Sequence, residues 1–228
     1  MKIADIAELI TEDVRTNNGL VLEASWPESI TEQIFQDKDF QGWLQSLKAV
    51  GTPSLLGEGG YGRTYQVGDK AVKITPDQDE VRVSRRSQEK CNDHPNLVKI
   101  FGIRPLGQFR DNFNRPRDFT AIVLEIVDDV GKPPELCAAA DLVGGCLDVN
   151  NLPPIADIKG TFEWILDYNK EENDPNPDTT TNKYVLQLLQ IVQSIYEHCK
   201  LRYKDVGCTN VGWSKGKIKL LDLGLSKF

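Results

Sequence analysis

The sequence predicts an α+β protein of two lobes, and three features of its residue pattern support this. Apolar residues recur at helical spacing through the first fifty positions, and short β-like runs separated by glycines begin at Leu55. A long amphipathic helix covers residues 185–199, and two more short β-like runs come after it. We expect a helical N-terminal extension at residues 1–50, a β-rich lobe at 51–128 and a minimal C-terminal lobe at 129–228.

The N-terminal extension is expected to form helices that pack on the rest of the chain. One face of the first helix consists of Ile3, Ile6, Leu9 and Ile10. A second helix is expected to start near Ser29, with Glu32 three residues on as in a capping box. Its apolar stripe continues through Phe40, Trp43, Leu44 and Leu47. Gly51 and Pro53 end this pattern.

The β-rich lobe alternates short strands with one helix. The expected strands cover residues 55–56, 64–67, 71–74, 97–101 and 120–127. Residues 77–91 are polar and predict a helix between the third and fourth strands. The stretch 108–118 is rich in Arg and Asn, and we expect it to form an exposed loop.

The C-terminal lobe is less regular in its first half. Residues 128–182 hold Pro-Pro, Gly-Gly and Asn-Pro pairs, which predict loops around short helices. After the amphipathic helix, two short strands are expected near residues 211–213 and 218–221.

The composition argues against several classes of protein. Lys and Arg total 27 against 34 Asp and Glu, and the net charge of −7 argues against a protein that binds nucleic-acid backbones. No apolar run approaches the roughly 20 residues that cross a bilayer, and the N-terminus lacks a secretory signal. We therefore expect a cytoplasmic protein with neither a nucleic-acid nor a membrane partner.

The cysteines argue against a zinc site. Five cysteines contain no Cys-x-x-Cys pair, and the chain has only two histidines. An odd number of cysteines without framework spacing favours a reduced protein.

The first chemical signal is Gly-Glu-Gly-Gly-Tyr-Gly at residues 57–62. Glycines let a backbone approach phosphate oxygens and direct its N–H groups at them. A dinucleotide-binding glycine motif opens a helix, whereas this one leads into the strand at 64–67, so we expect a glycine hairpin. An ordinary glycine turn is the structural alternative.

The second signal is Lys73 in the run Ala-Val-Lys-Ile at residues 71–74. This type of strand presents a lysine to ATP phosphates, and here it comes directly after the glycine hairpin. A lysine between β-branched residues can also simply belong to a solvated face.

The third signal joins two acidic positions. Asn210 stands five residues after Asp205, and Asp222 begins an Asp-Leu-Gly twelve residues later. One carboxylate can orient an attacking hydroxyl, while an amide oxygen and a second carboxylate can hold magnesium, because hard cations prefer oxygen ligands. An Asp-x-x-x-x-Asn loop alone would be turn chemistry.

Together these signals resemble the protein-kinase-like superfamily over about residues 55–225. The resemblance implies a two-lobed α+β fold and a phosphotransferase that uses ATP and Mg²⁺. Asp205 and Lys73 would be catalytic, and Asn210 and Asp222 would bind the metal. The nucleotide would contact Gly57, Gly59, Gly60, Tyr61, Gly62, Lys73 and the backbone of Glu125 and Val127.

Several positions depart from the kinase pattern. Tyr203 and Lys204 replace the usual His-Arg before the catalytic aspartate, and Gly207 replaces a common lysine. Only four residues come after Gly224, so the sequence shows no activation segment, as in a fragment or a minimal family.

The glutamate that pairs with the strand lysine cannot be chosen from spacing. Glu80 lies close to Lys73 in sequence, Glu89 lies close to His94, and Arg85 occupies the expected position. His94 itself falls in a segment that resembles the link between the regulatory helix and the fourth strand, where a histidine has a structural role.

The layout also resembles the early serine/threonine protein kinases of T7-like bacteriophages. Those proteins carry a helical extension before the glycine loop, similar in kind to residues 39–57, and a short Asp-x-x-x-x-Asn loop. This resemblance implies protein substrates, among them host proteins met in the host cytoplasm. Two alternatives stay open: a small-molecule phosphotransferase of the aminoglycoside type, and a pseudokinase that binds ATP or partners without catalysis.

Overall fold

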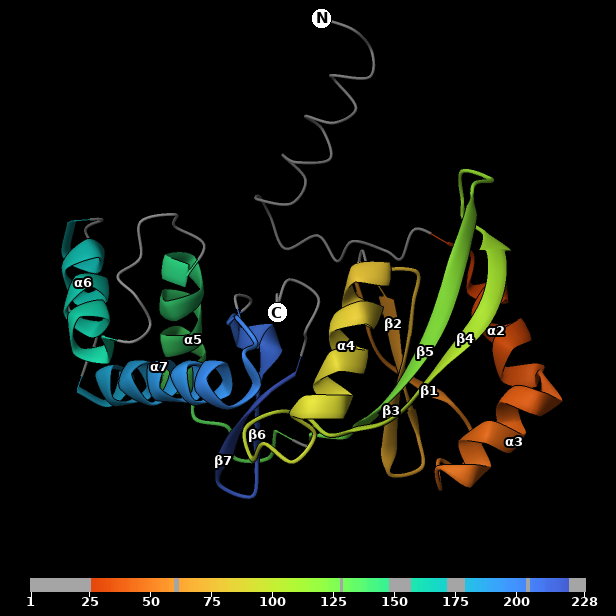
Figure 1. Ribbon diagram of the computed structural model, residues 1–228, viewed down its shortest axis with the longest axis horizontal. Coiled ribbons are helices and arrows are strands. Elements are labelled where there is room, and N and C mark those ends of the chain that lie inside the picture. The colour runs from red at the N-terminus through yellow and green to blue at the C-terminus, as the bar shows by residue number, and fades with distance from the viewer. Residues whose placement is uncertain are drawn as a thin grey trace, which may run out of the picture.

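The computed structural model describes residues 26–59, 62–127, 129–147, 157–171, 179–203 and 206–221. A sheet with flanking helices forms one lobe, and three helices with a small hairpin form the other (Figure 1). The first lobe contains α2 (Glu28–Gln36), α3 (Lys38–Ser46), β1 (Ser54–Gly59), β2 (Gly62–Val67), β3 (Lys70–Thr75), α4 (Gln78–Lys90), β4 (Ile100–Arg110) and β5 (Pro116–Glu125). The second contains α5 (Pro134–Leu147), α6 (Ile158–Glu171), α7 (Thr179–Cys199), the 3-10 turn η1 (Cys208–Asn210), β6 (Val211–Ser214) and β7 (Lys217–Leu220).

The five-stranded sheet has the order β1-β2-β3-β5-β4, with every neighbouring pair antiparallel. In β3, Val72 and Ile74 point to one face and Lys73 to the other, because side chains alternate along a strand. Lys73 lies opposite Thr64 on β2 and Ile122 on β5. The strands predicted at 55–56, 64–67 and 71–74 are confirmed with longer bounds, and the strand predicted at 120–127 is found at Pro116–Glu125.

Helices α2 and α3 cover the sheet face that carries Val72 and Ile74. The core on this face comprises Trp26, Ile30, Ile34, Phe40, Leu44, Ala49, Tyr65, Val67, Val72, Ile74, Phe119, Ala121 and Val123. The Tyr65 hydroxyl donates to Thr31 Oγ1 of α2 at 3.0 Å. Burial raises the pKa of Tyr65, although the hydrogen bond to Thr31 opposes this shift. The prediction that the N-terminal helices pack on the rest of the chain is confirmed for α2 and α3.

The helical extension differs from the sequence expectation in two details. Helix α2 begins after Pro27, so Ser29 lies inside its first turn and the predicted capping box is wrong. The apolar stripe belongs to two helices, because Asp37 interrupts it and its side chain accepts a bond from the Phe40 amide at 2.7 Å. The first predicted helix face, at residues 3–10, lies outside the described residues.

Helix α4 lies against the other face of the sheet, as residues 77–91 predicted. Asp77 caps its N-terminus by accepting bonds from the amides of Asp79 and Glu80 at 2.9 and 3.3 Å. Val81, Val83, Ser84 and Ser87 turn inward, while Arg82, Arg85 and Arg86 are exposed.

The prediction of an exposed loop at 108–118 is wrong. Strands β4 and β5 continue as a hairpin until Arg110 pairs with Pro116, and only the five residues 111–115 form the turn. The polar residues that suggested a loop belong to a two-stranded arm that extends past the rest of the sheet (Figure 1). The strand predicted to begin at Leu97 begins instead at Ile100.

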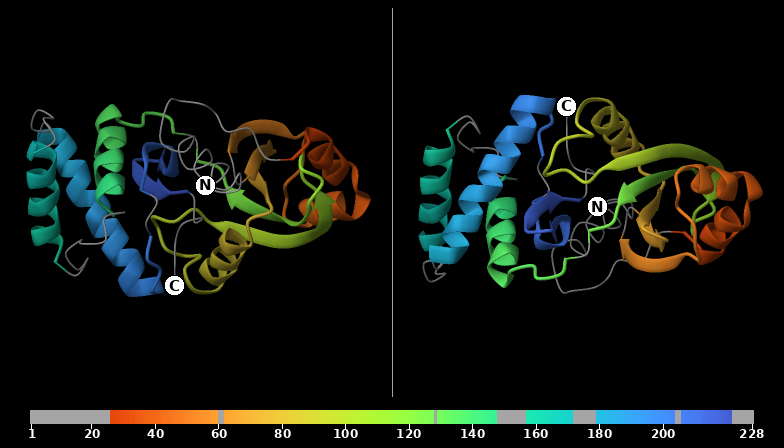
Figure 2. Two further views of the ribbon diagram at one scale, coloured as in Figure 1. Left: turned by 90° about the horizontal axis from the view of Figure 1, so that it is seen from above. Right: turned by 90° about the horizontal axis from the view of Figure 1, so that it is seen from below.

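In the second lobe, α5 and α6 both pack against α7, at the end of the molecule away from α2 and α3 (Figure 2). Their core includes Leu136, Ala139, Ala140, Val143, Ile165, Val185, Leu188, Leu189, Val192 and Ile195. Helices α5 and α6 have 14 residues each, so this region is more helical than its Pro and Gly pairs indicated. None of the helices in the described part of the chain has the length and apolarity needed to cross a membrane.

The two lobes are joined by the chain after β5 and also by contacts between the segment after α4 and strand β7. Leu97 forms a parallel bridge with Leu220 of β7, and the Val98 amide donates to the Leu220 carbonyl at 3.1 Å. The Asn96 side chain donates to the Ile218 carbonyl at 2.9 Å. The chain therefore has the two-lobed α+β arrangement of the protein-kinase-like fold, with helices ahead of the sheet and a small second lobe.

The odd number of cysteines favoured a reduced protein, whereas the structure contains two disulfides among the described residues. The structure pairs Cys91 with Cys199, whose Cα atoms are 5.5 Å apart, and Cys137 with Cys208, at 4.4 Å. These partners are 108 and 71 positions apart in sequence, so only the tertiary fold brings them together.

Candidate active site

The clearest polar feature between sheet and helix is an ion pair of Lys73 and Glu80. Lys73 Nζ lies 2.5 Å from Glu80 Oε1, and the two side chains are 13% and 4% exposed. The Asp77 cap starts α4 so that Glu80 falls in its first turn, directly over β3. Two charges are withdrawn from water only where their geometry compensates the desolvation, so this pair fixes the lysine's position.

This pair settles a choice that spacing left open. Glu80, and neither Glu89 nor Arg85, faces the strand lysine, because the latter two side chains lie on the exposed side of α4. The sequence signal was present in the Asp77 cap, which places the third residue after it in the first helical turn.

The glycine hairpin lies next to this lysine. A Cβ added at Gly62 would meet Lys73 Cε at 2.9 Å and the Ile74 carbonyl oxygen at 3.2 Å, so a larger residue there would displace the Lys73 side chain. At Gly57 and Gly59 an added Cβ would meet no atom of the described residues within 4 Å, and neither residue has a positive φ. Neither backbone conformation nor protein packing therefore demands glycine at these two positions, whereas close approach of a ligand would.

The strands on either side of the hairpin are held by a second ion pair. Arg63 Nε of β2 donates to Glu58 Oε2 of β1 at 2.6 Å, and the Arg63 guanidinium lies 5.6 Å from the Trp26 ring centre. Gly60 and Tyr61, also predicted to contact nucleotide, lie outside the described residues.

The segment that links the lobes places Glu125 and Val127 beside the second lobe. The Glu125 amide donates to the Lys99 carbonyl at 2.8 Å, so this amide is engaged within the protein. Glu125 Oε2 accepts a bond from Lys219 Nζ at 3.0 Å. The Val127 side chain packs on Gly212 of β6, where an added Cβ would lie 2.6 Å from it.

Asn210 closes the 3-10 turn that precedes β6. Its amide donates to the Gly207 carbonyl, and its own carbonyl accepts from the Leu221 amide, both at 2.9 Å. Asn210 is thus held beside the residue that precedes Asp222 in sequence. Asp205 and Asp222 themselves lie outside the described residues, but Tyr203 and Val206 on either side of the Asp205 position are buried core residues.

Helix α5 supports the turn before Asn210, which sequence reasoning missed. Asp141 Oδ1 accepts a bond from the Cys208 amide at 2.8 Å. Gly144, three residues on and on the same helix face, lets α5 approach the Val206 carbonyl so closely that an added Cβ would overlap it. Cys137, one turn earlier, pairs with Cys208. The one sequence signal for this approach was Gly144, whose Gly-Gly pair predicted a loop.

The segment before α5 adds a second support. Lys132 Nζ donates to the Cys208 carbonyl at 3.0 Å and to the Val211 carbonyl, and it lies 3.4 Å from Asp129 Oδ2. Asp129 Oδ1 accepts from the Trp213 amide at 2.6 Å. Two side chains from one short segment therefore bind the backbone on both sides of Asn210.

His94 lies apart from these residues, as its predicted structural role requires. Its Nδ1 accepts a bond from the Asn96 amide at 3.3 Å, and its Nε2 lies 3.2 Å from Ser194 Oγ of α7. Burial lowers the pKa of His94, and the nearby positive charges of His198 and Lys219 lower it further.

Comparison with known proteins gives structural neighbours only. No protein-family model and no curated protein matches the sequence. Solved structures that resemble the chain include APH(2")-IIa in a ternary complex with streptomycin and ATP, at 10% identity and a TM-score of 0.35 over 84% of this chain and 71% of that one. The aminoglycoside phosphotransferase APH(4)-Ia is similar at 19% identity and a TM-score of 0.39 over 82% and 70% of the two chains. The sheet order and the link between the lobes, and not these likenesses, define the fold.

Proposed function

We propose that the protein is an ATP- and Mg²⁺-dependent phosphotransferase that acts on protein hydroxyl groups, as a serine/threonine protein kinase. The observation that carries this proposal is the nearly buried Lys73–Glu80 pair directly beside a glycine hairpin. A lysine held by a helix glutamate next to such a hairpin is the arrangement with which kinases hold the α- and β-phosphates of ATP.

The residues around this pair fit a nucleotide. Gly57 and Gly59 face open space on the hairpin, where a phosphate could approach their backbone. The adenine would meet the Glu125 carbonyl and the Val127 backbone, since the Glu125 amide is already bonded to Lys99. In this proposal Gly60, Tyr61 and Gly62 form the rest of the hairpin that covers the phosphates.

The acceptor side of the site would be formed by the second lobe. Asp205 would orient the acceptor hydroxyl, and Asn210 and Asp222 would supply oxygen ligands for magnesium. Bound Mg-ATP supplies the transferable phosphoryl group. The position of Asn210 supports this role, since Asp141 and Lys132 make three bonds to the backbone of Cys208 and Val211 on either side of it. The resemblance to phage kinases supports host proteins as acceptors.

The decisive experiment is incubation with γ-labelled ATP, Mg²⁺ and a bacterial lysate, read on a gel. A parallel reaction offers aminoglycosides and small alcohols instead of proteins. We expect labelled proteins; label found only on small molecules would support the aminoglycoside-type alternative. Transfer to neither, together with a Mg-ATP-induced rise in melting temperature, would identify a pseudokinase.

The matched control is Asp205→Asn, which keeps side-chain shape and removes the carboxylate. Transfer should fall by roughly 10² or more, the scale of a lost general base. Mg-ATP should still raise the melting temperature of this variant, since Asp205 is not a proposed nucleotide contact. Full activity of Asp205→Asn would refute its assigned role.

A further inference from the structure

The β4–β5 hairpin extends well past the rest of its sheet. Strand β3 makes its last pair at Thr75 and Thr120, but β4 and β5 continue for four more pairs, to Arg110 and Pro116. At about 3.3 Å per residue the arm extends roughly 13 Å beyond β3. Figure 1 shows it rising above the sheet. Strands β1, β3 and β4 run in the same direction, so the tip lies at the same end as the glycine hairpin.

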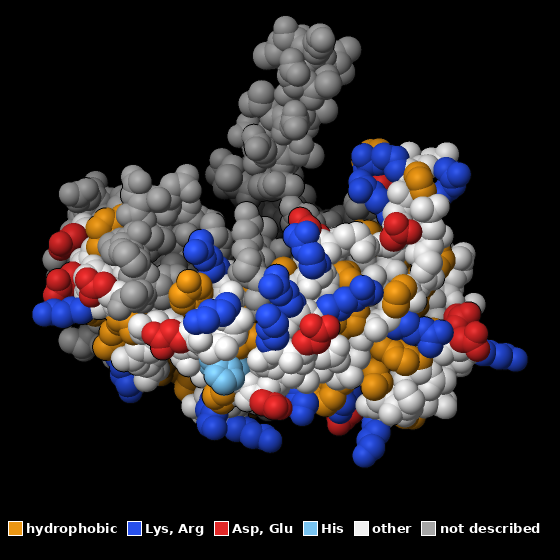
Figure 3. All heavy atoms as spheres, in the orientation of Figure 1, with side chains coloured by type: hydrophobic (Ala, Val, Ile, Leu, Met, Phe, Trp, Pro, Cys, Tyr) orange, Lys and Arg blue, Asp and Glu red, His pale blue; other side chains and the backbone are white. Residues whose placement is uncertain are grey.

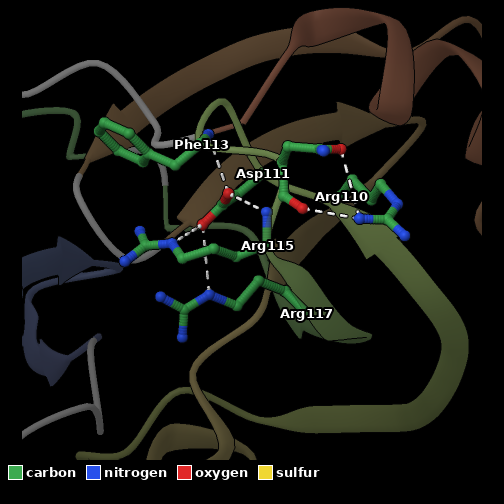
Figure 4. Close-up of polar contacts among 6 residues, drawn as sticks. Arg110, Asp111, Phe113, Arg115 and Arg117 are labelled. Carbon is green, nitrogen blue, oxygen red and sulfur yellow. Dashed lines mark hydrogen bonds and ion pairs between the residues drawn. The ribbon is translucent and has the colours of Figure 1, made fainter.

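A buried aspartate organises the tip of this arm. The Asp111 side chain is 2% exposed, and its Oδ1 accepts bonds from the amides of Phe113 and Arg115, both at 2.9 Å. Its Oδ2 accepts from Arg115 Nε at 2.9 Å and Arg117 Nε at 3.4 Å (Figure 4). Burial alone would raise the pKa of Asp111, but the bonds from Arg115 and Phe113 outweigh it and lower this pKa. The carboxylate therefore stays charged and fixes the turn.

Asp111 orients Arg115 and Arg117 but binds only the Nε of each side chain. Both bind Asp111 through Nε, and their terminal nitrogens point away from the carboxylate (Figure 4). Their side chains remain 55% and 47% exposed for Arg115 and Arg117. A guanidinium held in this way loses little freedom when it binds a second carboxylate with its two terminal nitrogens.

An aromatic ring and a third arginine complete the tip. Phe113 is 70% exposed, and the Arg115 guanidinium lies 4.8 Å from its ring centre. Arg110 donates to the Asn114 carbonyl at 2.8 Å. Residues 110–117 hold three arginines and one aspartate, a charge of +2 on a chain whose net charge is −7. Figure 3 shows basic side chains at this tip, and others over the rest of the same face.

We propose that the tip of the β4–β5 hairpin is a docking site for an acidic segment of a partner protein. The exposed guanidinium groups match carboxylates, and Phe113 offers the apolar contact that arginine and aromatic residues commonly supply at protein interfaces. A nucleic acid fits less well, since such interfaces bury a large basic surface and this tip carries three cations on an acidic chain. The docking site uses no residue of the proposed nucleotide site, so it stands independently of the proposed function.

The test measures binding of a fluorescent Glu/Asp-rich peptide to the full chain by anisotropy at low salt. A Gln/Asn-rich analogue and a single-stranded oligonucleotide of equal net charge are run beside it. The double variant Arg115→Gln, Arg117→Gln removes two charges, while each amide can still donate to Asp111. We expect it to bind the acidic peptide roughly 2- to 30-fold more weakly, the range for two exposed ion pairs.

Two further variants keep the result interpretable. Phe113→Ser leaves the Asp111 contacts in place, because Phe113 contributes only its backbone amide, and it should also weaken binding. Lys38→Gln with Lys159→Gln removes the same charge from exposed positions elsewhere and should leave binding unchanged. If the double arginine variant fails to fold, as judged by circular dichroism, Phe113→Ser decides.

The proposal is overturned if wild type does not bind the acidic peptide, if it binds the neutral analogue equally, or if the hairpin variants bind as wild type does. Tighter binding of the oligonucleotide, lost in the same variants, would replace the protein partner with a nucleic acid.

Discussion

The two halves of the candidate site are built in different ways. In the sheet lobe, Lys73 and its partner Glu80 are seven residues apart and belong to consecutive elements, β3 and α4. In the helical lobe, the turn that ends at Asn210 is held by Asp141 and Lys132, whose bonds to Cys208 span 67 and 76 residues. The first half is a local product of the sequence, and the second depends on the packing of a whole lobe.

This difference suggests how each half responds to change. The ion pair is nearly buried and set by a strand and a capped helix, so replacing one partner removes its chemistry and also leaves the other charge in a desolvated position. The turn before Asn210 has no regular strand or long helix of its own, so its geometry depends on the closeness of α5. If variants of both halves lost activity and stability to the same extent, the two halves would not differ in this way.

The largest effect is expected in the sheet lobe. Lys73→Met should lower phosphotransfer by roughly 10²–10³, the scale for loss of one preorganised charged donor. The measurement is initial rate with labelled ATP, with Mg-ATP thermal shift as the binding readout. Glu80→Gln should lower the rate less, since lysine would remain but be less well placed. Equal activity of Lys73→Met and wild type would remove Lys73 from the site.

The next effect concerns the approach of α5 to the turn. Gly144→Ala places a Cβ against the Val206 carbonyl and should destabilise the fold by about 1–3 kcal/mol, as overpacking does. The chain offers a matched control next to it. Gly145 also lies in α5 but has nothing within 4 Å, so Gly145→Ala should stabilise by about 0.5–1 kcal/mol through helix propensity. Urea unfolding of both variants measures the difference; equal stabilities would contradict the close approach.

A smaller effect is expected from Asp141→Ala. It removes the acceptor of the Cys208 amide while leaving helix and core intact, so the cost is that of one exposed hydrogen bond, about 0.5–1.5 kcal/mol. We expect the phosphotransfer rate to fall by several-fold and the melting temperature to fall by about 1–6 °C. If Asp141→Ala lost much stability but the remaining folded enzyme had normal activity, Asp141 would stabilise the fold without positioning the turn that contains Asn210.

These contrasts also explain what the sequence could predict. The strands, α4 and the identity of Lys73 come from local signals: alternation, turn glycines and the V-A-I-K type of run. The extent of the β4–β5 arm could not be predicted from local signals, because its Arg and Asn residues are compatible with both a loop and an isolated hairpin. Glu80 could not be chosen by spacing from a family pattern, although the Asp77 cap determines it. Asp141, Gly144 and Lys132 act over long sequence separations, and no local periodicity reports such contacts.

The smallest expected effect is on the pH dependence of stability, and it concerns His94, which lies where the two lobes meet. His94 closes the segment after α4 and contacts Ser194 of α7, so it belongs to both lobes. Its pKa is lowered in the folded protein by burial, with His198 and Lys219 adding to the shift, whereas an unfolded histidine titrates near about 6.5. Below that pH the unfolded chain takes up a proton that the folded protein resists. The stabilisation is therefore complete above about pH 6.5 and is lost as the pH falls toward the folded pKa.

Thermal unfolding between pH 8 and pH 5 should show this loss in wild type. His94→Gln keeps a hydrogen-bonding side chain without a titrating group, and its melting temperature should depend less on pH across this window. His198→Gln serves as the matched control, because His198 is exposed and its removal takes away one positive neighbour of His94 while leaving His94 itself to titrate. If the melting temperature of His94→Gln depended on pH as strongly as that of wild type, other titrating groups and not His94 would cause the effect.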